Sequence, residues 1–283
     1  MPINALLLVV AGALLHAVWN LSAKRAGGGT VFIWAFNAVS VLVTAPLAVA
    51  SWQPVGLSGW LAISASALIH IGYNLALLRG YRDSEFSVVY PTARGTGPLF
   101  AVFGALLLFG ERPSAVGALG IACIVVGLFL LGGGRAVLAR GQAAAVGVRW
   151  GALTGVFIAG YTLTDAWAVT HIGVPVALYY CLGLLVRTLV LVPVPLRESA
   201  ALRACWRDSW RHVLVIGVCS PLAYLLVLQA MTMAPLSYVA PLREMSMLIG
   251  VVIGARVLRE ALTPARALGA VLMLAGVSLL SVA

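Results

Sequence analysis

Of the ionisable side chains inside apolar stretches long enough to cross a lipid bilayer, four are the strongest candidates for a functional role. They are Arg94, Asp165, Arg243 and Glu244. Charged groups at membrane depth are rare, and they usually face one another or a water-filled cavity. We therefore interpret these residues as candidates either for structural ion pairs or for contacts with a polar solute. Asp165 is also the candidate for a group that takes up a proton.

The stretch that holds Arg94 is interrupted by residues that break helices. Residues 86–109 contain Pro91 and Pro98, and the same layout returns at Pro241 near the C-terminus. A broken helix in hydrocarbon must be sheltered by protein or line a cavity, because its unpaired backbone groups are costly there. We expect these prolines to let two helices bend beside an ion pair. The candidates for gating or ion pairing are Arg94, Arg243, Glu244, Pro91, Pro98 and Pro241.

Other polar and aromatic side chains recur within the apolar stretches. His16, Trp19 and Asn20 share one face of a helix because they are three and four residues apart, and Tyr73 and Asn74 belong to a similar group. We expect them to line a polar, aromatic cavity, although aromatic residues can also anchor span ends and amides can join neighbouring helices. The candidate substrate contacts are His16, Trp19, Asn20, Trp34, Tyr73, Asn74, Tyr90, Arg94, Tyr161, Asp165, Trp167 and Tyr224.

Composition assigns the chain to the helical membrane proteins. Of its 283 residues, 62% are hydrophobic and 9% are charged, whereas a soluble domain is about half apolar and a quarter charged. The apolar runs are continuous rather than alternating, which excludes a transmembrane β-barrel. The net charge of +10 does not indicate a nucleic-acid partner, because the arginines lie between apolar runs and form no basic face.

Ten stretches have about the 20 apolar residues that a transmembrane helix needs. The fifth and tenth carry almost no polar side chains, so we expect them at the periphery and the other eight around a central cavity. The ten stretches are 4–23, 30–50, 58–78, 86–109, 114–132, 150–170, 174–194, 211–232, 235–255 and 264–282.

The two halves of the sequence resemble each other. A repeat with an odd number of spans must be inverted relative to its copy, as in many secondary transporters. We predict a five-helix unit over 1–132, a connecting loop over 133–149 and an inverted five-helix unit over 150–283. The matched positions, at one constant offset, are Glu111 and Glu260, Leu119 and Leu268, Gly120 and Gly269, Gly127 and Gly276, and Leu131 and Leu280.

Basic residues are divided unequally between the loops. Nearly all of them follow odd-numbered spans, and Arg112 alone follows an even-numbered one. By the positive-inside rule, the basic loops are cytoplasmic and both chain termini lie outside. The basic loops follow the first and third spans of the first half but the second and fourth of the second half, as expected for inverted copies.

The sequence contains no pattern for a cofactor or a metal. There is no Gly-x4-Gly-Lys-Ser/Thr run, so a phosphate-binding loop is absent. We expect neither a metal nor a cofactor, and we expect no enzyme active site, because no His, Asp and Glu pattern stands at a span end. The cysteines, which have no metal-like spacing, are Cys123, Cys181, Cys205 and Cys219.

Three segments resemble the EamA-domain branch of the drug/metabolite transporter superfamily. They are His16-Ala-Val-Trp-Asn20, Val89-Tyr-Pro-Thr-Ala-Arg-Gly-Thr-Gly-Pro98 and Ala240-Pro-Leu-Arg-Glu244. The resemblance is to exporters of aromatic amino acids of the YddG type. It implies ten helices, an inverted five-plus-five repeat and a central cavity. It also implies a secondary active transporter that exports small metabolites, commonly amino acids, by alternating access.

The resemblance implies a place in the lipid bilayer of the bacterial inner membrane and a small-molecule substrate. A monomer is sufficient because both halves are in one chain, and a dimer is possible. Members of the family are commonly drawn with both termini in the cytoplasm, whereas the charges of this chain place them outside. An uncoupled facilitator or flippase is the alternative function, and an integral-membrane enzyme is a more remote one.

Overall fold

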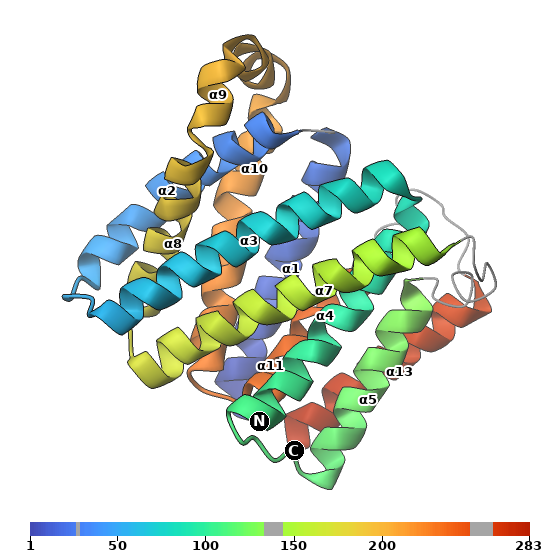
Figure 1. Ribbon diagram of the computed structural model, residues 1–283. Helices are drawn as coiled ribbons and strands as arrows, with labels where there is room; N and C mark the ends of the chain where they lie inside the picture. The colour runs from blue at the N-terminus through green and yellow to red at the C-terminus, as the bar shows by residue number, and fades with distance from the viewer. Residues whose placement is uncertain (27–28, 133–143, 250–262) are drawn as a thin grey trace.

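The computed structural model describes residues 1–26, 29–132, 144–249 and 263–283, which form helices and loops without a strand (Figure 1). The expectation of an all-helical protein is confirmed. The helices are α1 (Ile3–Ala26), α2 (Thr30–Ala50), α3 (Leu57–Asp83), α4 (Phe86–Leu108), α5 (Ala115–Leu131), α7 (Ala145–Trp167), the π-helix η2 (Ala168–Ile172), α8 (Val176–Leu191), α9 (Pro193–Arg197), α10 (Ser199–Met231), α11 (Leu236–Arg243) and α13 (Pro264–Val282).

Each predicted span contains a helix, and seven described helices are long and apolar enough to cross a membrane. Three helices extend five or more residues beyond the expected stretches. The helix α3 ends at Asp83 rather than at 78. The helix α7 begins at Ala145, inside the predicted connector, and α10 begins at Ser199 rather than at 211. The added turns of α10 consist largely of alanine, leucine and arginine, which favour a helix as strongly as apolar residues do. Their charge hid this helix from a search for apolar stretches.

The pairs of helices that pack together are related between the two predicted halves. The helix α1 packs on α10 and α7 packs on α3, while α2 packs on α8, α4 on α11 and α5 on α13. If each helix is exchanged for its predicted counterpart in the other half, the same pairs result. In Figure 1, α5 and α13 lie together at one edge of the bundle, where the sequence predicts peripheral helices.

Glycines at the contact between α5 and α13 reveal how the two halves are related. A Cβ atom on Gly276 would lie 2.7 Å from the carbonyl oxygen of Gly120, and one on Gly269 would lie 2.8 Å from that of Gly127. The repeat matches Gly120 with Gly269 and Gly127 with Gly276. If each glycine is replaced by its match in the other half, the contact between Gly120 and Gly276 becomes the contact between Gly269 and Gly127. Such an exchange is the mark of a two-fold axis between antiparallel elements. It agrees with an inverted repeat, whereas the division at 133–149 remains a prediction.

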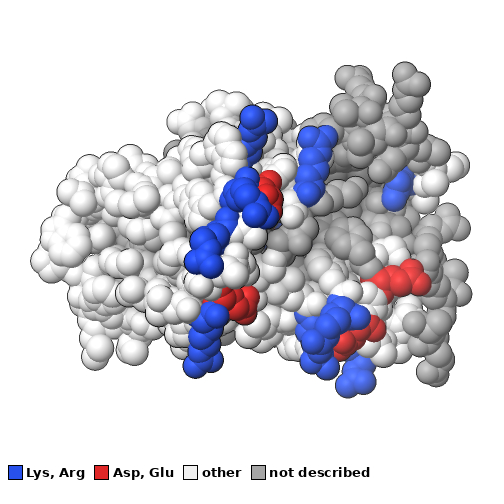
Figure 2. All heavy atoms as spheres, turned by 90° about the horizontal axis from the view of Figure 1, so that it is seen from above, with Lys and Arg blue, Asp and Glu red and all other residues white. Residues whose placement is uncertain are grey.

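The charges are unequally distributed between the two ends of the bundle. Figure 2 looks down on the end that holds α9 and the first turns of α10, where arginine side chains gather. Both termini lie at the opposite end (Figure 1). The asymmetry expected from the loops is therefore present in space. The orientation itself, with both termini outside the cell, remains a prediction.

The glycine contact generates a first prediction. Replacing Gly276 with alanine should lower the free energy of unfolding by about 1–3 kcal/mol, because the new methyl group must push two backbones apart. Thermal unfolding of the detergent-solubilised protein measures this change. Gly183→Ala in α8 is the matched control, since its Cβ would meet no atom within 4 Å. Equal melting temperatures for both variants would contradict the close contact.

Candidate functional site

An ion pair connects the two helices that contain buried charges and prolines. Arg94 Nη1 on α4 lies 3.0 Å from Glu244 Oε2, which directly follows α11. The side chain of Arg94 is 13% exposed and that of Glu244 is 1% exposed. Two candidates for ion pairing are therefore in contact, and Glu244 lies one residue beyond the position that the constant offset of the repeat matches with Arg94. Because removing both ions from water is costly, a buried ion pair does not by itself show that the pair stabilises the fold.

Arg94 has a second partner on α1. Its Nη2 atom lies 2.8 Å from His16 Nε2. A guanidinium can only donate hydrogen bonds, so His16 Nε2 must accept and its imidazole must be neutral, with the proton on Nδ1. The ring of His16 in turn packs edge-on against Trp19, with 4.7 Å between the ring centres. These contacts fix Arg94 between α1, α4 and α11.

Arg243 joins the same cluster from the end of α11. Its Nε atom lies 3.4 Å from Glu244 Oε1, and its Nη1 donates to Thr162 Oγ1 at 3.4 Å. The Nη2 atom is buried and has no hydrogen-bond partner among the described residues. The regular helix ends here because Glu244 N–H donates to the carbonyl of Pro241, three residues back, at 3.0 Å. The break places Arg243 and Glu244 next to each other at one level of the bundle.

Asp165 lies in a separate and tighter environment. It is 1% exposed, and each of its oxygens accepts a short hydrogen bond. Tyr179 donates to Oδ1 at 2.6 Å and Tyr224 donates to Oδ2 at 2.5 Å. These bonds join α7 to α8 and α10. In this structure Asp165 is a fixed link between three helices, and its predicted roles in substrate or proton binding remain untested.

Aromatic rings lie between Asp165 and the cluster of Arg94, Arg243 and Glu244. Tyr161 stacks on His70, with 3.9 Å between ring centres, and meets Tyr73 edge-on at 5.9 Å. It also lies 6.2 Å from Tyr224, and the Arg243 guanidinium is 6.0 Å from its ring centre. The structure thus brings together the predicted residues Tyr73, Tyr161 and Tyr224. The predicted site residues do not include His70, Tyr179, Tyr180 and Arg187, which the same polar spacing within apolar stretches could have identified.

Other predicted residues use their polar atoms within or between helices. Asn20 and Asn74 donate to the carbonyls of His16 and His70, four residues earlier, at 2.8 and 3.0 Å. Such bonds to the preceding turn are common for polar side chains in helices. Trp34 donates a hydrogen bond to the carbonyl of Thr188 at 3.1 Å. The ring centre of Tyr90 is 5.6 Å from the Arg94 guanidinium, and Trp167 is 42% exposed.

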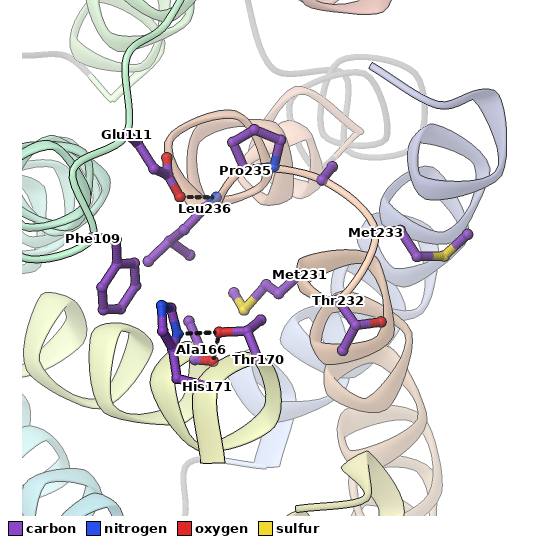
Figure 3. Close-up of a pocket in the computed structure, with 11 residues that line it drawn as sticks. Phe109, Glu111, Ala166, Thr170, His171, Met231, Thr232, Met233, Pro235 and Leu236 are labelled. Carbon is purple, nitrogen blue, oxygen red and sulfur yellow. Dashed lines mark hydrogen bonds between the residues drawn. The ribbon is translucent and has the colours of Figure 1, made fainter. Parts of the chain in front are cut away.

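A pocket of about 360 Å³ lies at one end of the bundle, away from the ion pair (Figure 3). On its wall, Glu111 accepts hydrogen bonds from the backbone N–H groups of Leu236 (2.7 Å) and Ser237 (2.8 Å). A carboxylate there satisfies free donors and complements the helix dipole. The predicted site residues do not include Glu111, although its recurrence in the repeat as Glu260 was a signal. Glu260 lies outside the described residues.

The cavity expected around the cluster remains a prediction. Within the described ranges, no group of three or more His, Cys, Asp or Glu side chains is arranged to hold a metal ion. The chemistry available at the cluster is therefore that of hydrogen bonding and charge: guanidinium donors, a carboxylate, a neutral imidazole and aromatic faces. Such groups can bind a polar or charged solute.

The Asp165 environment generates the second prediction. Replacing Tyr224 with phenylalanine should lower the free energy of unfolding by about 1–3 kcal/mol, because a buried carboxylate oxygen loses its donor. Thermal unfolding in detergent measures the change. Tyr73→Phe is the control, since the described residues form no hydrogen bond with its hydroxyl and its ring would stay against Tyr161. The fixed link would be disproved by an equal effect of the two substitutions.

Comparison with known proteins agrees with the fold. No curated protein matches the chain. A solved structure described as "Crystal structure of protein" has a TM-score of 0.80 and 16% sequence identity, covering 100% of this chain and 98% of that one. At this identity the likeness shows the fold alone. Residues 145–282 match the EamA-like transporter family, which indicates a membrane transporter of small solutes. The chain is therefore an integral membrane protein that carries an EamA-like transporter domain over residues 145–282.

Proposed function

We propose that the protein is a secondary active transporter that exports small metabolites by alternating access. The proposed substrates are amino acids, either aromatic ones or a broader amphipathic set. The observation that carries the proposal is the buried cluster of Arg94, His16, Arg243 and Glu244 at the contact between α4 and α11. We place the protein in the bacterial inner membrane, where one chain with both halves can act as a monomer.

The cost of the cluster supports a functional role. Replacing a buried ion pair by apolar residues is often neutral or stabilising, so folding alone does not require these charges. A transporter does require polar groups at depth, because its substrate must exchange water for protein contacts. The cluster also lies where α4 and α11 carry prolines, at the contact between the two predicted halves. Relative movement of those halves would change this contact directly.

The side chains around the cluster suit an amphipathic solute. Tyr73, Tyr90 and Tyr161 are partly exposed, and their rings offer apolar faces. Tyr90 and Tyr161 also lie under the guanidinium groups of Arg94 and Arg243. A solute with an apolar body and a charged end could therefore place the body on the rings and the charged end at an arginine. Transport of aromatic amino acids is one form of this chemistry.

The third prediction concerns transport in proteoliposomes. Counterflow of radiolabelled amino acids should be saturable, and Arg94→Ala should reduce its initial rate at least ~10-fold, equivalent to about 1.4 kcal/mol. Arg112→Ala, in an exposed position after α4, is the matched control and should transport normally. The assay is repeated with and without a proton gradient and with Asp165→Asn to identify coupling.

The possible results separate the functions that the sequence left open. Flux without trans-stimulation would indicate an uncoupled facilitator or flippase instead of a carrier. Normal transport by well-expressed Arg94→Ala and Asp165→Asn would contradict the proposed site. Absence of saturable flux for every amino acid tested would contradict the proposed substrate class.

A further inference from the structure

The buried charges in the described part of the chain do not balance. Three arginines lie in the interior, Arg94, Arg187 and Arg243, against the two carboxylates of Asp165 and Glu244. One positive charge is therefore in excess. An uncompensated charge in a protein interior is costly unless another ion accompanies it. The imbalance indicates that the interior is suited to one further negative charge.

Hydrogen-bond donors are also in excess at the cluster. Glu244 is the acidic partner of both Arg94 and Arg243. Arg243 is 3% exposed, and its Nη2 atom has no hydrogen-bond partner among the described residues. The Nε1 atom of Trp19, whose ring packs against His16, has no partner among them either. Two guanidinium groups can together hold two carboxylates, because each presents a fork of N–H donors. The unfilled donors and the excess charge favour the same kind of ligand, an anion.

The bonds that hold Glu244 are long for an ion pair. Its Oε1 atom lies 3.3 Å from Arg94 Nη1 and 3.4 Å from Arg243 Nε, whereas strong charge-assisted bonds measure about 2.7–2.9 Å. Its Oε2 atom is 3.0 Å from Arg94 Nη1 but is not aligned for a hydrogen bond. The carboxylate therefore pairs with both arginines without filling the N–H donors of either one. A better-placed anion could replace it at one of them.

We propose that Arg94 and Arg243 form an anion receptor in which Glu244 holds the place of the substrate's carboxylate or phosphate group. The solute's anionic group takes Arg94, which is the more exposed of the two arginines. The carboxylate of Glu244 then moves onto Arg243, whose Nη2 is free to receive it. With a bound anion that carries no cationic group, the described interior then contains three positive and three negative charges.

This inference rests on the proposed transport function and makes it more specific. The solute must carry a negative group, so a decarboxylated amine of the same shape is excluded. His16 keeps the Arg94 guanidinium in place through its 2.8 Å contact, and the Tyr90 ring lies beside it. The exchange also gives the helix break after α11 a role, because Glu244 must move while Arg243 remains.

The fourth prediction uses the full chain in detergent and measures binding of four probes at pH 7. The probes are L-phenylalanine and benzoate as carboxylates, phenyl phosphate as a phosphate, and phenethylamine as the amine without an anionic group. Glu244→Gln should bind at least one anion about 10-fold more tightly than the unmodified protein does, because the competing charge is gone, and should bind phenethylamine no better. The anion that responds identifies the group as carboxylate or phosphate.

Two further variants make the test decisive. Asp208→Asn, which replaces an exposed carboxylate in the first turns of α10, is the control and should leave anion affinity unchanged. Arg243→Gln removes the place to which Glu244 moves, so it should weaken anion binding at least about 10-fold even if Glu244→Gln does not fold. The inference is overturned if neither variant changes anion affinity in the stated direction, or if phenethylamine responds equally. Because binding is measured without transport, saturable counterflow by the unmodified protein would still support the proposed function after that result.

Discussion

The burial of charge inside an apolar bundle is the constraint that organises this structure. Arg94 cannot remain unpaired at depth, and its partners come from three directions: Glu244 beyond α11, His16 on α1 and the ring of Tyr90 on its own helix. Glu244 and His16 are available to Arg94 only if α11 and α1 each lie at one position against α4. The charge thus specifies the arrangement of helices more than it stabilises them, since an apolar substitute could pack at least as well.

The short helix α11 depends on α4 at both of its ends. Eight residues form a marginal helix by themselves, because nucleation is unfavourable. Glu111, which follows α4, satisfies the first N–H groups of α11, and Arg94 binds Glu244 beyond its last residue. The contact between α5 and α13 is of the opposite kind, with backbones packed directly at glycines. The bundle therefore combines a close-packed edge with a polar centre in which the bonds to Glu244 are long.

The sequence predicted the helices and their relation better than it predicted individual contacts. Apolar length identified each span, and the rarity of charge at membrane depth singled out Arg94 and Glu244 as candidates for ion pairing. The start of α10 was wrong because its first turns are helical without being apolar. The bonds from Tyr179 and Tyr224 to Asp165 could not be predicted, since they depend on the rotation of three helices about their axes. Sequence spacing constrains faces within one helix only.

The two buried carboxylates, Asp165 and Glu244, have different surroundings, which favour different roles. The sequence did not distinguish these roles. Asp165 is held by two short bonds from phenols on different helices, so its movement would break the contact of α7 with α8 and α10. Glu244 is held by longer bonds to two arginines and stands where the helix is already interrupted. A group that must change partners during a transport cycle needs weak bonds and a free alternative donor. Glu244 meets both conditions through Arg243, which makes it a better candidate than Asp165 for the carboxylate that moves.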